Sequence, residues 1–595
     1  MIQETSITLF TVQDVDRLPE KLIREKLAQK LRCSEKQING FFLKKKSLDA
    51  RHGKVKFHLR YQVFTGSDKP QPLALTAPQY RACPKDAPVV VVVGSGPAGL
   101  FAALKLIQGG IKPIILERGN RAPQRKRDIA AISTRHQVNP DSNYCFGEGG
   151  AGTFSDGKLY TRSNKRGNIE GILQVFHYFG ANEQILTDAH PHIGTDKLPS
   201  VIQAMTEKIS ECGGEIHFGW RCTELLLKDT AEGPRVMGVE AVAVASVFDG
   251  AVVDSPSAVD ESSLFEKNPQ KKKIFAEAVI LATGHSATDI YQLLSRQLPA
   301  ALEEKTFAMG VRVEHPREII DSIQFHGAQK KARLGAAEYR LVSQVDERGV
   351  YSFCMCPGGL VVPSASCEAG LVVNGMSPSS RGGRWSNAAI VVEIRPQDFD
   401  VLIRQLEEKL REAGIDVTGS FAGLETSKSE AFRFDVNKVE ASFDSSCKGL
   451  YLRTLLEILT KHYGKGQQAP AQLLEDFLGH RPSEVLPRSS YSPGLVASRL
   501  DTWLPDYLCQ RLQKAFMDYN KKMQGFICSQ ALLIASETRT STPVRIVRNP
   551  ETYECVAASG LYPAGEGSGY SGGIVSSAMD GEAVAAAVVK KLLVC

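Results

Sequence analysis

The sequence predicts an α/β protein that is built on a Rossmann-like dinucleotide-binding domain and preceded by a small α+β domain. Two observations carry this prediction. A run of valines at residues 89–93 is followed by glycines and then by an apolar stretch with helical spacing, which is the order of a strand, a tight turn and a helix. Ahead of this unit, residues 1–66 mix helical and alternating apolar patterns.

The first 66 residues are expected to form a small α+β domain of their own. Helical spacing relates Leu18, Leu22, Ile23, Leu27 and Leu31, whereas Val55, Phe57, Leu59, Tyr61 and Val63 alternate as in strands. Residues 67–87, which are rich in Pro, Gln and Ala, are predicted to be a linker. The lysines at 44–46 beside two phenylalanines indicate a solvated turn before a strand, or alternatively a nucleic-acid-binding surface.

The glycine turn after the valine strand predicts a dinucleotide site. Gly94 permits the tight turn, Gly96 lets the backbone approach a pyrophosphate, and Gly99 allows the helix to pack closely on the strand. The helix that begins at Pro97 and Ala98 directs its amide donors at that pyrophosphate. A second strand at 113–116 leads to Glu117, which is expected to receive ribose hydroxyls, with Arg118 beside it.

Composition narrows the class of protein. The 595 residues are enough for several domains, and 43% hydrophobic with 23% charged residues is typical of a globular chain. The formal net charge of +6 implies no general attraction to nucleic acid. The 13 cysteines form no repeating framework, which favours a reducing, cytoplasmic location. We expect no signal peptide and no membrane span, because glycines and Pro97 interrupt the long apolar stretch.

Further elements follow along the chain. A helix is predicted at 198–210, and strands are predicted at 215–227. The polar stretch 248–273 is predicted to be a surface insertion. A strand at 309–316 places Arg312 and Glu314 on one face, either lining a pocket or forming an ion pair at a solvated surface. Arg381 and Arg384 are candidates to hold an anionic substrate.

Three more segments carry a resemblance to a known group of proteins. They are the glycine-rich stretch 146–158, the Leu-Ala-Thr-Gly-His-Ser stretch 281–286 and the late stretch 561–570. With the glycine turn, they make the chain similar to the glutathione-reductase-like FAD superfamily, and within it to uncharacterised FAD-dependent dehydrogenases labelled NAD(P)/FAD-dependent oxidoreductases. The resemblance covers nearly the whole chain.

The resemblance implies a non-covalently bound FAD and a discontinuous FAD-binding domain. Residues 88–294 and 530–595 would form this domain, and residues 295–529 would form an inserted α+β substrate domain. Small residues in the glycine-rich loop and in the two later turns would contact the cofactor: Gly149, Gly150, Thr153, Ala282, Thr283, Gly284, Gly565, Glu566, Gly572, Gly573 and Ile574. Most relatives have Asp where this chain has Glu566, which keeps the carboxylate but lengthens its reach.

Four residues are candidates for the chemistry. His285 is a candidate proton donor, although such a histidine more commonly bonds a backbone carbonyl. Cys354 and Cys356 would share one face of a strand and suggest a redox pair, but cysteines two residues apart make strained disulfides, and plain burial is favoured. Arg539 is a candidate positive charge near the flavin. No metal site is predicted, because no second closely spaced pair of ligands is present.

The leading hypothesis is an FAD-dependent oxidoreductase that moves a hydride or two electrons between unidentified partners. NADH or NADPH is a candidate electron donor on the resemblance alone, since no second glycine fingerprint follows a strand. Two alternatives stay open: an FAD-dependent protein that modifies or binds nucleic acid, and a redox sensor whose N-terminal domain docks on another protein. The partner is expected to be a small molecule or a redox protein rather than nucleic acid.

Overall fold

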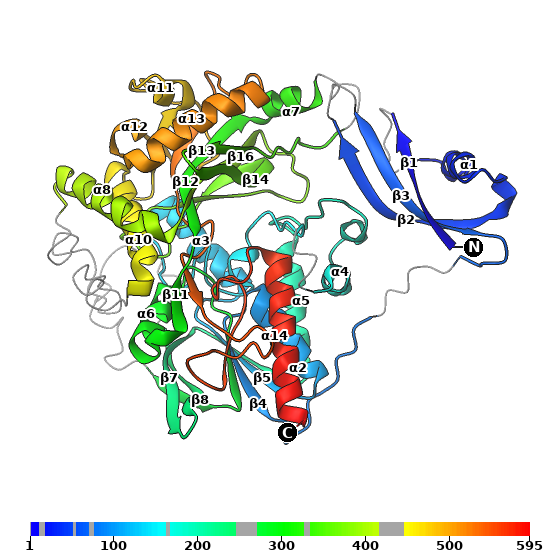
Figure 1. Ribbon diagram of the computed structural model, residues 1–595, viewed down its shortest axis with the longest axis horizontal. Helices are drawn as coiled ribbons and strands as arrows, with labels where there is room; N and C mark the ends of the chain where they lie inside the picture. Colours follow the sequence, from blue (N-terminus) through cyan, green and yellow to red (C-terminus); the bar gives the residue numbers. More distant parts are fainter. Residues whose placement is uncertain are drawn as a thin grey trace, which may run out of the picture.

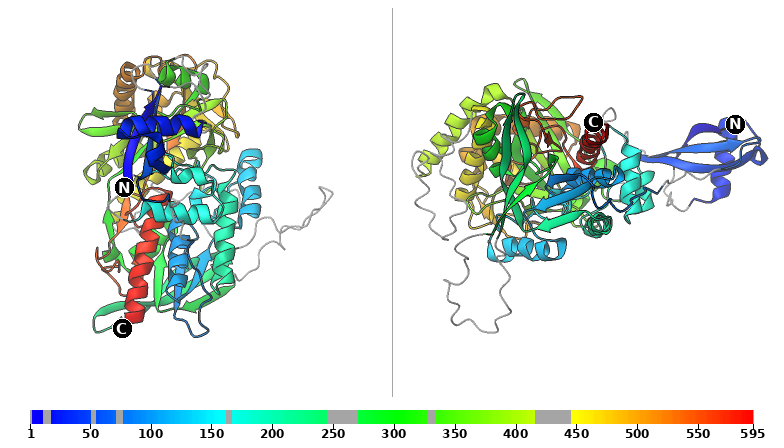
Figure 2. Two further views of the ribbon diagram at one scale, coloured as in Figure 1. Left: turned by 90° about the vertical axis from the view of Figure 1, so that its right-hand side faces the viewer. Right: turned by 90° about the horizontal axis from the view of Figure 1, so that it is seen from below.

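The structure is a computed structural model that describes residues 2–10, 18–50, 55–70, 77–161, 167–244, 270–326, 334–415 and 445–594. It has a main body in two parts, one around a parallel sheet and one around a larger, mostly antiparallel sheet (Figure 1). A small N-terminal unit projects from the side of this body, as the two views of Figure 2 show.

The parallel sheet contains the glycine turn. Its five strands lie in the order β21 (Leu561–Pro563), β10 (Ala278–Leu281), β4 (Val89–Val93), β5 (Lys112–Glu117) and β6 (Glu215–Phe218). All four pairings are parallel, and β4 is almost fully buried, as expected for a continuous apolar run in a covered sheet. After β4 the chain continues to β5, which pairs with one edge of β4, whereas β10 pairs with the other edge. The strand order therefore reverses at β4.

Helices and a small sheet cover this parallel sheet. The helices of this part of the body are α2 (Pro97–Gln108), α3 (Ala122–Arg135), α4 (Ile169–Tyr178), α5 (Leu198–Glu211), α6 (Thr288–Gln297) and α14 (Ile574–Val594). Among them α2 contacts both α5 and α14. An antiparallel sheet of β7 (Trp220–Thr230), β8 (Gly233–Ala243) and β9 (Lys271–Phe275) packs nearby, and β11 (Leu302–Glu304) pairs with β20 (Val544–Ile546).

The larger sheet forms the other part of the body. Its strands follow the order β13 (Val342–Val345), β14 (Arg348–Pro363), β16 (Trp385–Ile394), β12 (Phe307–Pro316), β19 (Leu532–Glu537), β17 (Ala469–Leu473) and β18 (Leu495–Ala497), and β15 (Val373–Met376) pairs with β14. The helices of this part are α7 (Arg317–Phe325), α8 (Phe399–Glu412), α10 (Lys448–Tyr463), α11 (Leu474–Leu478), α12 (Leu500–Trp503) and α13 (Asp506–Lys522).

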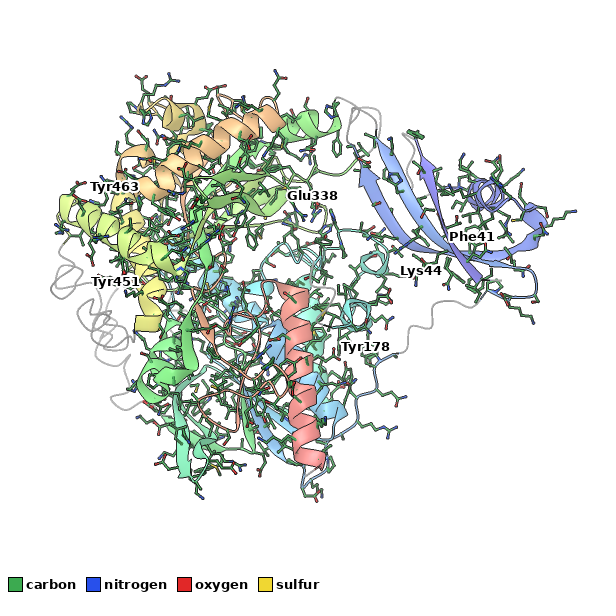
Figure 3. The ribbon with its side chains drawn as sticks, in the orientation of Figure 1. Phe41, Lys44, Tyr178, Glu338, Tyr451 and Tyr463 are labelled. Carbon is green, nitrogen blue, oxygen red and sulfur yellow. The ribbon has the colours of Figure 1, made fainter. Side chains whose placement is uncertain are left out.

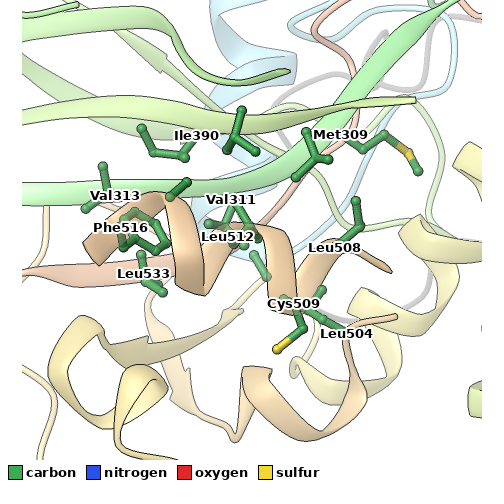
Figure 4. Close-up of a cluster of buried hydrophobic side chains, with 14 of the residues drawn as sticks. Met309, Val311, Val313, Ile390, Leu504, Leu508, Cys509, Leu512, Phe516 and Leu533 are labelled. Atoms are coloured by element: carbon green, nitrogen blue, oxygen red, sulfur yellow. The ribbon is translucent and has the colours of Figure 1, made fainter. Parts of the chain in front are cut away.

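Helix α13 packs on the centre of this sheet. Leu508, Leu512 and Phe516 recur every four residues and are fully buried, so they form one apolar stripe. The stripe lies against Val311 and Ile390 of the two central strands (Figure 4). This core holds the strand β14 in place, and β14 supplies part of the site described below.

The N-terminal unit is an α+β structure, as predicted. Strands β1 (Ile2–Leu9), β3 (Lys56–Thr65) and β2 (Ile38–Asp49) form an antiparallel sheet in that order, and α1 (Glu20–Leu31) packs on it. Lys46 attaches β2 to the main body: its amide donates to the Thr187 carbonyl (2.8 Å), and its ammonium pairs with Asp188 (3.2 Å). Figure 3 labels the neighbouring Lys44 where this unit approaches the body.

One sequence-based expectation differs from the structure, and another lies mostly outside the described residues. The lysines at 44–46 lie inside strand β2 and not in a turn, because β2 runs on to Asp49 and pairs with β3 along its length. The predicted insertion 248–273 is outside the described residues up to 269, and its last three lysines belong to strand β9. Within the described ranges, no helix combines the length and the apolar character that crossing a bilayer requires.

Candidate functional site

A single large cavity opens at the carboxyl ends of the parallel strands. Its volume is about 1350 Å³, and its wall includes the glycine turn after β4, the glycine-rich loop, the turn after β10 and the start of α14. The cavity continues past these segments to side chains of strand β14, including Tyr351 and Phe353. The edge where parallel strands end and their order reverses is where ligands bind in open α/β sheets.

The glycine turn has the geometry that the sequence predicts. Gly94 has φ +103°, and a Cβ atom there would lie 2.4 Å from the carbonyl oxygen of Ala282. Gly96 faces the cavity, and its nearest neighbour is the Cα atom of Gly150, 3.9 Å from where a Cβ would stand. Gly99 does not itself line the cavity: a Cβ there would lie 1.9 Å from the carbonyl oxygen of Gly94 and 3.3 Å from Val92 Cγ1, so its absence lets α2 pack closely on β4, as predicted.

The start of α2 directs unpaired amides into the same space. Gly96 is the N-cap, Pro97 occupies the first turn, and both line the cavity together with Ala98. The first amides of a helix have no intrahelical acceptor, and the helix dipole adds positive potential there. A helix start of this kind can hold a diphosphate through its backbone, and the role of these residues towards the FAD diphosphate stays a prediction.

Glu117 lines the cavity at the end of β5 and is already well bonded. Its Oε2 accepts hydrogen bonds from the Ser95 amide (3.0 Å) and hydroxyl (2.8 Å). Its Oε1 accepts from the amides of Gly119 and Gly147, both at 2.9 Å. The carboxylate therefore ties the glycine turn to the glycine-rich loop, and its role towards ribose hydroxyls stays a prediction.

Arg118 is also in the wall, and it is neutralised by neighbours. Its guanidinium pairs with Asp141 (2.7 Å) and Asp289 (2.9 Å), and it lies 4.3 Å from the ring centroid of Phe146. Burial alone would lower the pKa of Arg118, but the two carboxylates more than offset it and raise that pKa. Arg118 is thus a charged side chain that two carboxylates hold in a fixed position in the cavity wall.

The glycine-rich loop contributes only part of what was predicted. Gly150 lines the cavity and faces Gly96. Gly149 and Thr153 do not line it: Gly149 has φ +77°, and the Thr153 hydroxyl donates to the Glu148 carbonyl at 2.6 Å. These two residues lie outside the cavity wall and stabilise the conformation of the loop. Lys158 belongs to the same motif, where the sequence predicts no role for it, and it lines the cavity.

The two later segments lie beside the glycine turn: a Cβ at Gly94 would stand 2.4 Å from the Ala282 oxygen, and one at Gly565 would stand 2.7 Å from the Ala98 Cβ. All eight residues predicted there line the cavity: Ala282, Thr283, Gly284, Gly565, Glu566, Gly572, Gly573 and Ile574. No atom lies within 4 Å of a Cβ built at Gly284 or Gly572, so the backbone is open to a ligand at both positions. Helix α14 begins at Ile574, and its amino end, with the positive end of its dipole, faces this space.

His285 pairs with Glu566 across this wall. Its Nδ1 lies 3.6 Å from Glu566 Oε1, and both side chains are mostly buried and line the cavity. A backbone carbonyl is the more common partner expected for such a histidine, whereas His285 pairs with a carboxylate. The role of His285 as a proton donor stays a prediction.

Arg539 does not present a free positive charge. Its guanidinium makes two bonds to Glu457, Nε to Oε1 at 3.0 Å and Nη2 to Oε2 at 2.8 Å, and a third to the Ser366 hydroxyl at 2.7 Å. It lines the cavity but is 6% exposed. The ion pair with Glu457 neutralises the charge that was predicted to act on the flavin.

Arg312 and Glu314 differ from both predicted alternatives. Strand β12 is buried, neither side chain lines the cavity, and Arg312 pairs with Glu537 (2.9 Å) instead of Glu314. Burial raises the pKa of Glu537 to about 6, opposed by the charge of Arg312. Arg381 lines the cavity but pairs with Asp156 at 3.3 Å, so it is not a free anion-binding group.

Cys354 lines the cavity, whereas Cys356 is buried behind it. Cys354 has φ +45°, and the pairing of β14 with β16 shifts register between Phe353 and Cys356. The two cysteines therefore do not alternate as in the regular strand that the sequence predicts. The thiol of Cys356 donates to the carbonyl oxygen of Cys354 (3.2 Å), so the two residues remain in contact. Among the described residues, no cluster of side chains has the composition of a metal site.

Comparisons with family models agree with the cavity. Residues 86–131 match an FAD binding domain, and residues 306–415 and 428–540 match "FAD-dependent protein, C-terminal domain-like". Residues 1–64 match a domain of unknown function, DUF8436. The glycines, the open backbone positions and the two helix amino ends fit FAD, which settles the cofactor.

Solved structures that resemble the chain are distant. CtdE in complex with FAD is 11% identical, with 85% of this chain and 89% of that chain covered and a TM-score of 0.27. A flavoprotein/dehydrogenase from Cytophaga hutchinsonii is 11% identical, with 52% and 56% covered and a TM-score of 0.23. Similarities this weak carry no argument about activity.

A full-length relative defines the family. An uncharacterized protein of Clostridium beijerinckii is 34% identical over 596 residues, which cover 96% of each chain. The chain therefore belongs to the family of this clostridial protein, and it is a flavoprotein whose cofactor is FAD.

Proposed function

We propose that the protein is an FAD-dependent oxidoreductase that moves two electrons, or a hydride, through a non-covalently bound flavin to or from a second molecule. The size and continuity of the cavity carry this proposal. At about 1350 Å³ it exceeds the roughly 300–1,000 Å³ of an ordinary ligand pocket. The wall beyond the FAD segments is formed by β14, so the same space accommodates a cofactor and a substrate.

The side chains at this end of the cavity suit a polar substrate with an apolar portion. Tyr351 and Phe353 offer aromatic faces, and Glu338 and Arg340 offer both signs of charge. Glu338 is itself paired with Arg381, so part of this charge is internally compensated. Figure 3 labels Glu338 in this part of the body.

The chain's own residues would divide the work as follows. The amides at the start of α2 hold the diphosphate, and the amino end of α14 stabilises negative charge at the other end of the cofactor. His285, oriented by Glu566, holds a proton at its ring near the turn after β10. The bound flavin supplies the electron transfer itself.

The finer assignments belong to the same proposal. The order of the FAD segments along the chain supports membership in the glutathione-reductase-like superfamily, with residues 88–294 and 530–595 as the FAD-binding domain and 295–529 as the substrate domain. The cysteines of the described ranges are free thiols, which supports a cytoplasmic location. NADH or NADPH is the proposed electron donor.

Anaerobic reduction of the flavin tests the proposal. The purified protein should show an oxidised flavin spectrum that bleaches when NADH or NADPH is added and recovers when an acceptor is supplied. Bleaching by only one of the two nucleotides would identify the donor. A protein that holds FAD but is reduced by neither nucleotide, nor by any candidate substrate, would contradict the proposal.

A further inference from the structure

The part of the cavity wall that comes from the larger sheet is one face of two paired strands. Val342 of β13 pairs with Tyr351 of β14, and the Ser352 amide donates to the Leu341 carbonyl (2.8 Å), so the pairing continues beyond the start of β13. Alternate residues of paired strands lie on the same side of a sheet. Six residues that alternate in this way line the cavity: Arg340, Val342, Gln344, Gly349, Tyr351 and Phe353.

The middle of this face is aromatic. Tyr351 and Phe353 are half-buried, and one side of each packs on small side chains of the same sheet: Ala308, Ala389 and Val391. Their remaining surface faces the cavity. A ring placed against them gains offset or edge-to-face contacts in addition to the burial of apolar area. This stretch of the wall therefore suits the aromatic part of a ligand.

One cation at the end of this face differs from the others in the cavity wall. Five of the six Lys and Arg side chains in the wall have a carboxylate oxygen no more than 3.3 Å away: Arg118, Lys158, Arg221, Arg381 and Arg539. Arg340 is the sixth. Within the described ranges it makes no ion pair, and its guanidinium lies 5.8 Å from the ring centroid of Tyr160, which is a neutral neighbour.

The carboxylate nearest to Arg340 in sequence is held by other partners. Glu338, labelled in Figure 3, accepts from Arg381 and lies 3.0 Å from His190 Nδ1. Burial opposes the ionisation of Glu338, but His190 and Arg381 outweigh this effect and lower its pKa to about 2. Glu338 is therefore ionised, and its charge is used by these two partners.

The charges near Arg340 leave an excess of one. Lys158, Arg381 and Arg340 supply three positive charges to this part of the wall, whereas Asp156 and Glu338 supply two negative charges. The unmatched positive charge is that of Arg340. A guanidinium can bind both oxygens of a carboxylate through two parallel hydrogen bonds. The excess charge therefore matches a single carboxylate better than a doubly charged phosphate.

We propose that this face of β13 and β14 binds an aromatic carboxylate, with the carboxylate on Arg340 and the ring on Tyr351 and Phe353. The inference deepens the proposed function and rests on it in treating this ligand as the substrate. It transfers to Arg340 the anion-binding role that the sequence predicts for Arg381 and Arg384. Arg381 is paired with Asp156, and Arg384 does not line the cavity.

Calorimetric titration of the full-length, FAD-bound protein with 3-phenylpropionate tests the proposal. Two matched probes separate the parts of the ligand, because 3-phenylpropionamide has the same shape without the charge and propionate has the charge without the ring. We expect 3-phenylpropionate to bind at least about tenfold more tightly than either one, since a charge-assisted hydrogen bond and a buried ring each contribute that much. If the amide or propionate binds as tightly as 3-phenylpropionate, the proposal is overturned.

Substitution of Arg340 locates the carboxylate. Arg340→Gln should weaken the binding of 3-phenylpropionate at least about tenfold, to the level of the amide. Arg340→Lys, which keeps the charge but not the planar fork, should recover part of the affinity. Arg384→Gln removes an arginine outside the cavity wall and is the matched control, so it should bind as the unchanged protein does.

Two results with Arg340→Gln would contradict the proposal. One is an unchanged affinity for 3-phenylpropionate. The other is the loss of FAD, measured as flavin absorbance per protein, because Arg340 would then serve the cofactor and not a second ligand. Arg340 is exposed, so its replacement leaves the buried core as it is.

Substitution of Phe353 locates the ring. Phe353→Leu keeps an apolar side chain at this position but removes the aromatic face. It should weaken the binding of 3-phenylpropionate about three- to tenfold and leave the binding of propionate unchanged. Equal affinity of Phe353→Leu and the unchanged protein for 3-phenylpropionate would show that the ring does not lie on this face, and the proposal would fail.

The outcomes separate this inference from the proposed function, because binding to the oxidised protein needs no electron transfer. If 3-phenylpropionate does not bind while NADH or NADPH still bleaches the flavin, the carboxylate site is wrong and the oxidoreductase stands. If 3-phenylpropionate binds through Arg340 but neither nucleotide nor any candidate substrate reduces the flavin, the oxidoreductase is wrong and the carboxylate site stands.

Discussion

Replacing Gly96 by valine should remove FAD while leaving the fold intact. A Cβ at this position would meet only the Cα atom of Gly150, at 3.9 Å, which is ordinary van der Waals contact, and the backbone φ of −69° suits any residue. The protein itself therefore tolerates the side chain. The cost in folding stability is limited to the loss of a favourable N-cap residue, about 1 kcal/mol.

The cost in cofactor binding should be larger. The valine side chain would fill the space through which a diphosphate approaches the α2 amides, so those hydrogen bonds would lengthen or be lost. Losing two hydrogen bonds to a charged group, at about 1.5 kcal/mol each, corresponds to roughly 100-fold weaker FAD binding. Fluorescence titration of apoprotein with FAD measures this change directly.

A matched control separates the site from a general effect. A Cβ built at Gly335 has no atom within 4 Å, and unlike Gly96 this glycine does not line the cavity. Gly335→Val should therefore bind FAD as the unchanged protein does. If Gly96→Val keeps its affinity for FAD, the assignment of the glycine turn to the diphosphate is refuted.

Three further predictions concern stability and docking. Burial lowers the pKa of His315 from 6.5 to about 4, so acid protonates this histidine in the unfolded chain before it does so in the folded protein. The free energy of unfolding, measured in urea, should therefore fall by about 2 kcal/mol between pH 8 and pH 5. The variant His315→Gln should lose this part of the pH dependence. Gly99→Ala should lower the thermal midpoint of the apoprotein, because the added Cβ would stand 1.9 Å from the Gly94 oxygen. The expected loss in the free energy of unfolding is about 1–3 kcal/mol. Gly572→Ala, whose Cβ would stand in open space, should leave the midpoint unchanged. Lys46→Asp replaces the ion pair with Asp188 (3.2 Å) by two facing carboxylates, which should loosen the N-terminal unit from the body. Limited proteolysis should therefore cut the Lys46→Asp variant between these two parts faster than it cuts the control variant Lys44→Asp. Equal cleavage rates in the two variants would contradict this account of docking.

The sequence predicts the local parts of the site well. The Val89–Val93 strand, its glycine turn and α2 depend on residues that are close in the chain, and each glycine has its own steric reason. The segments around Gly284 and Gly565 were identified by resemblance, and both line the cavity. The part that could be predicted from the sequence was therefore the part of the cavity wall formed by these glycine turns.

The remainder depends on contacts between distant segments. Arg539 looks like a free charge in the sequence, because its partner Glu457 belongs to a helix 82 residues earlier. Lys158 contacts the Met355 carbonyl, 197 residues later in the chain, in a part of β14 where the pairing with β16 shifts register. The positive φ of Cys354 has no signal in its own residue type, since left-handed backbone normally points to glycine.

The position of β21 has a consequence for how the protein is made. This edge strand of the parallel sheet and the following helix α14 come from the last 35 residues, and α14 crosses α2 so closely that a Cβ at Gly581 would lie 2.0 Å from the Ala98 oxygen. Residues 89–117 acquire these neighbours only once residues 561–594 have been synthesised. We therefore expect FAD to be captured late in folding, after β21 and α14 have joined the sheet.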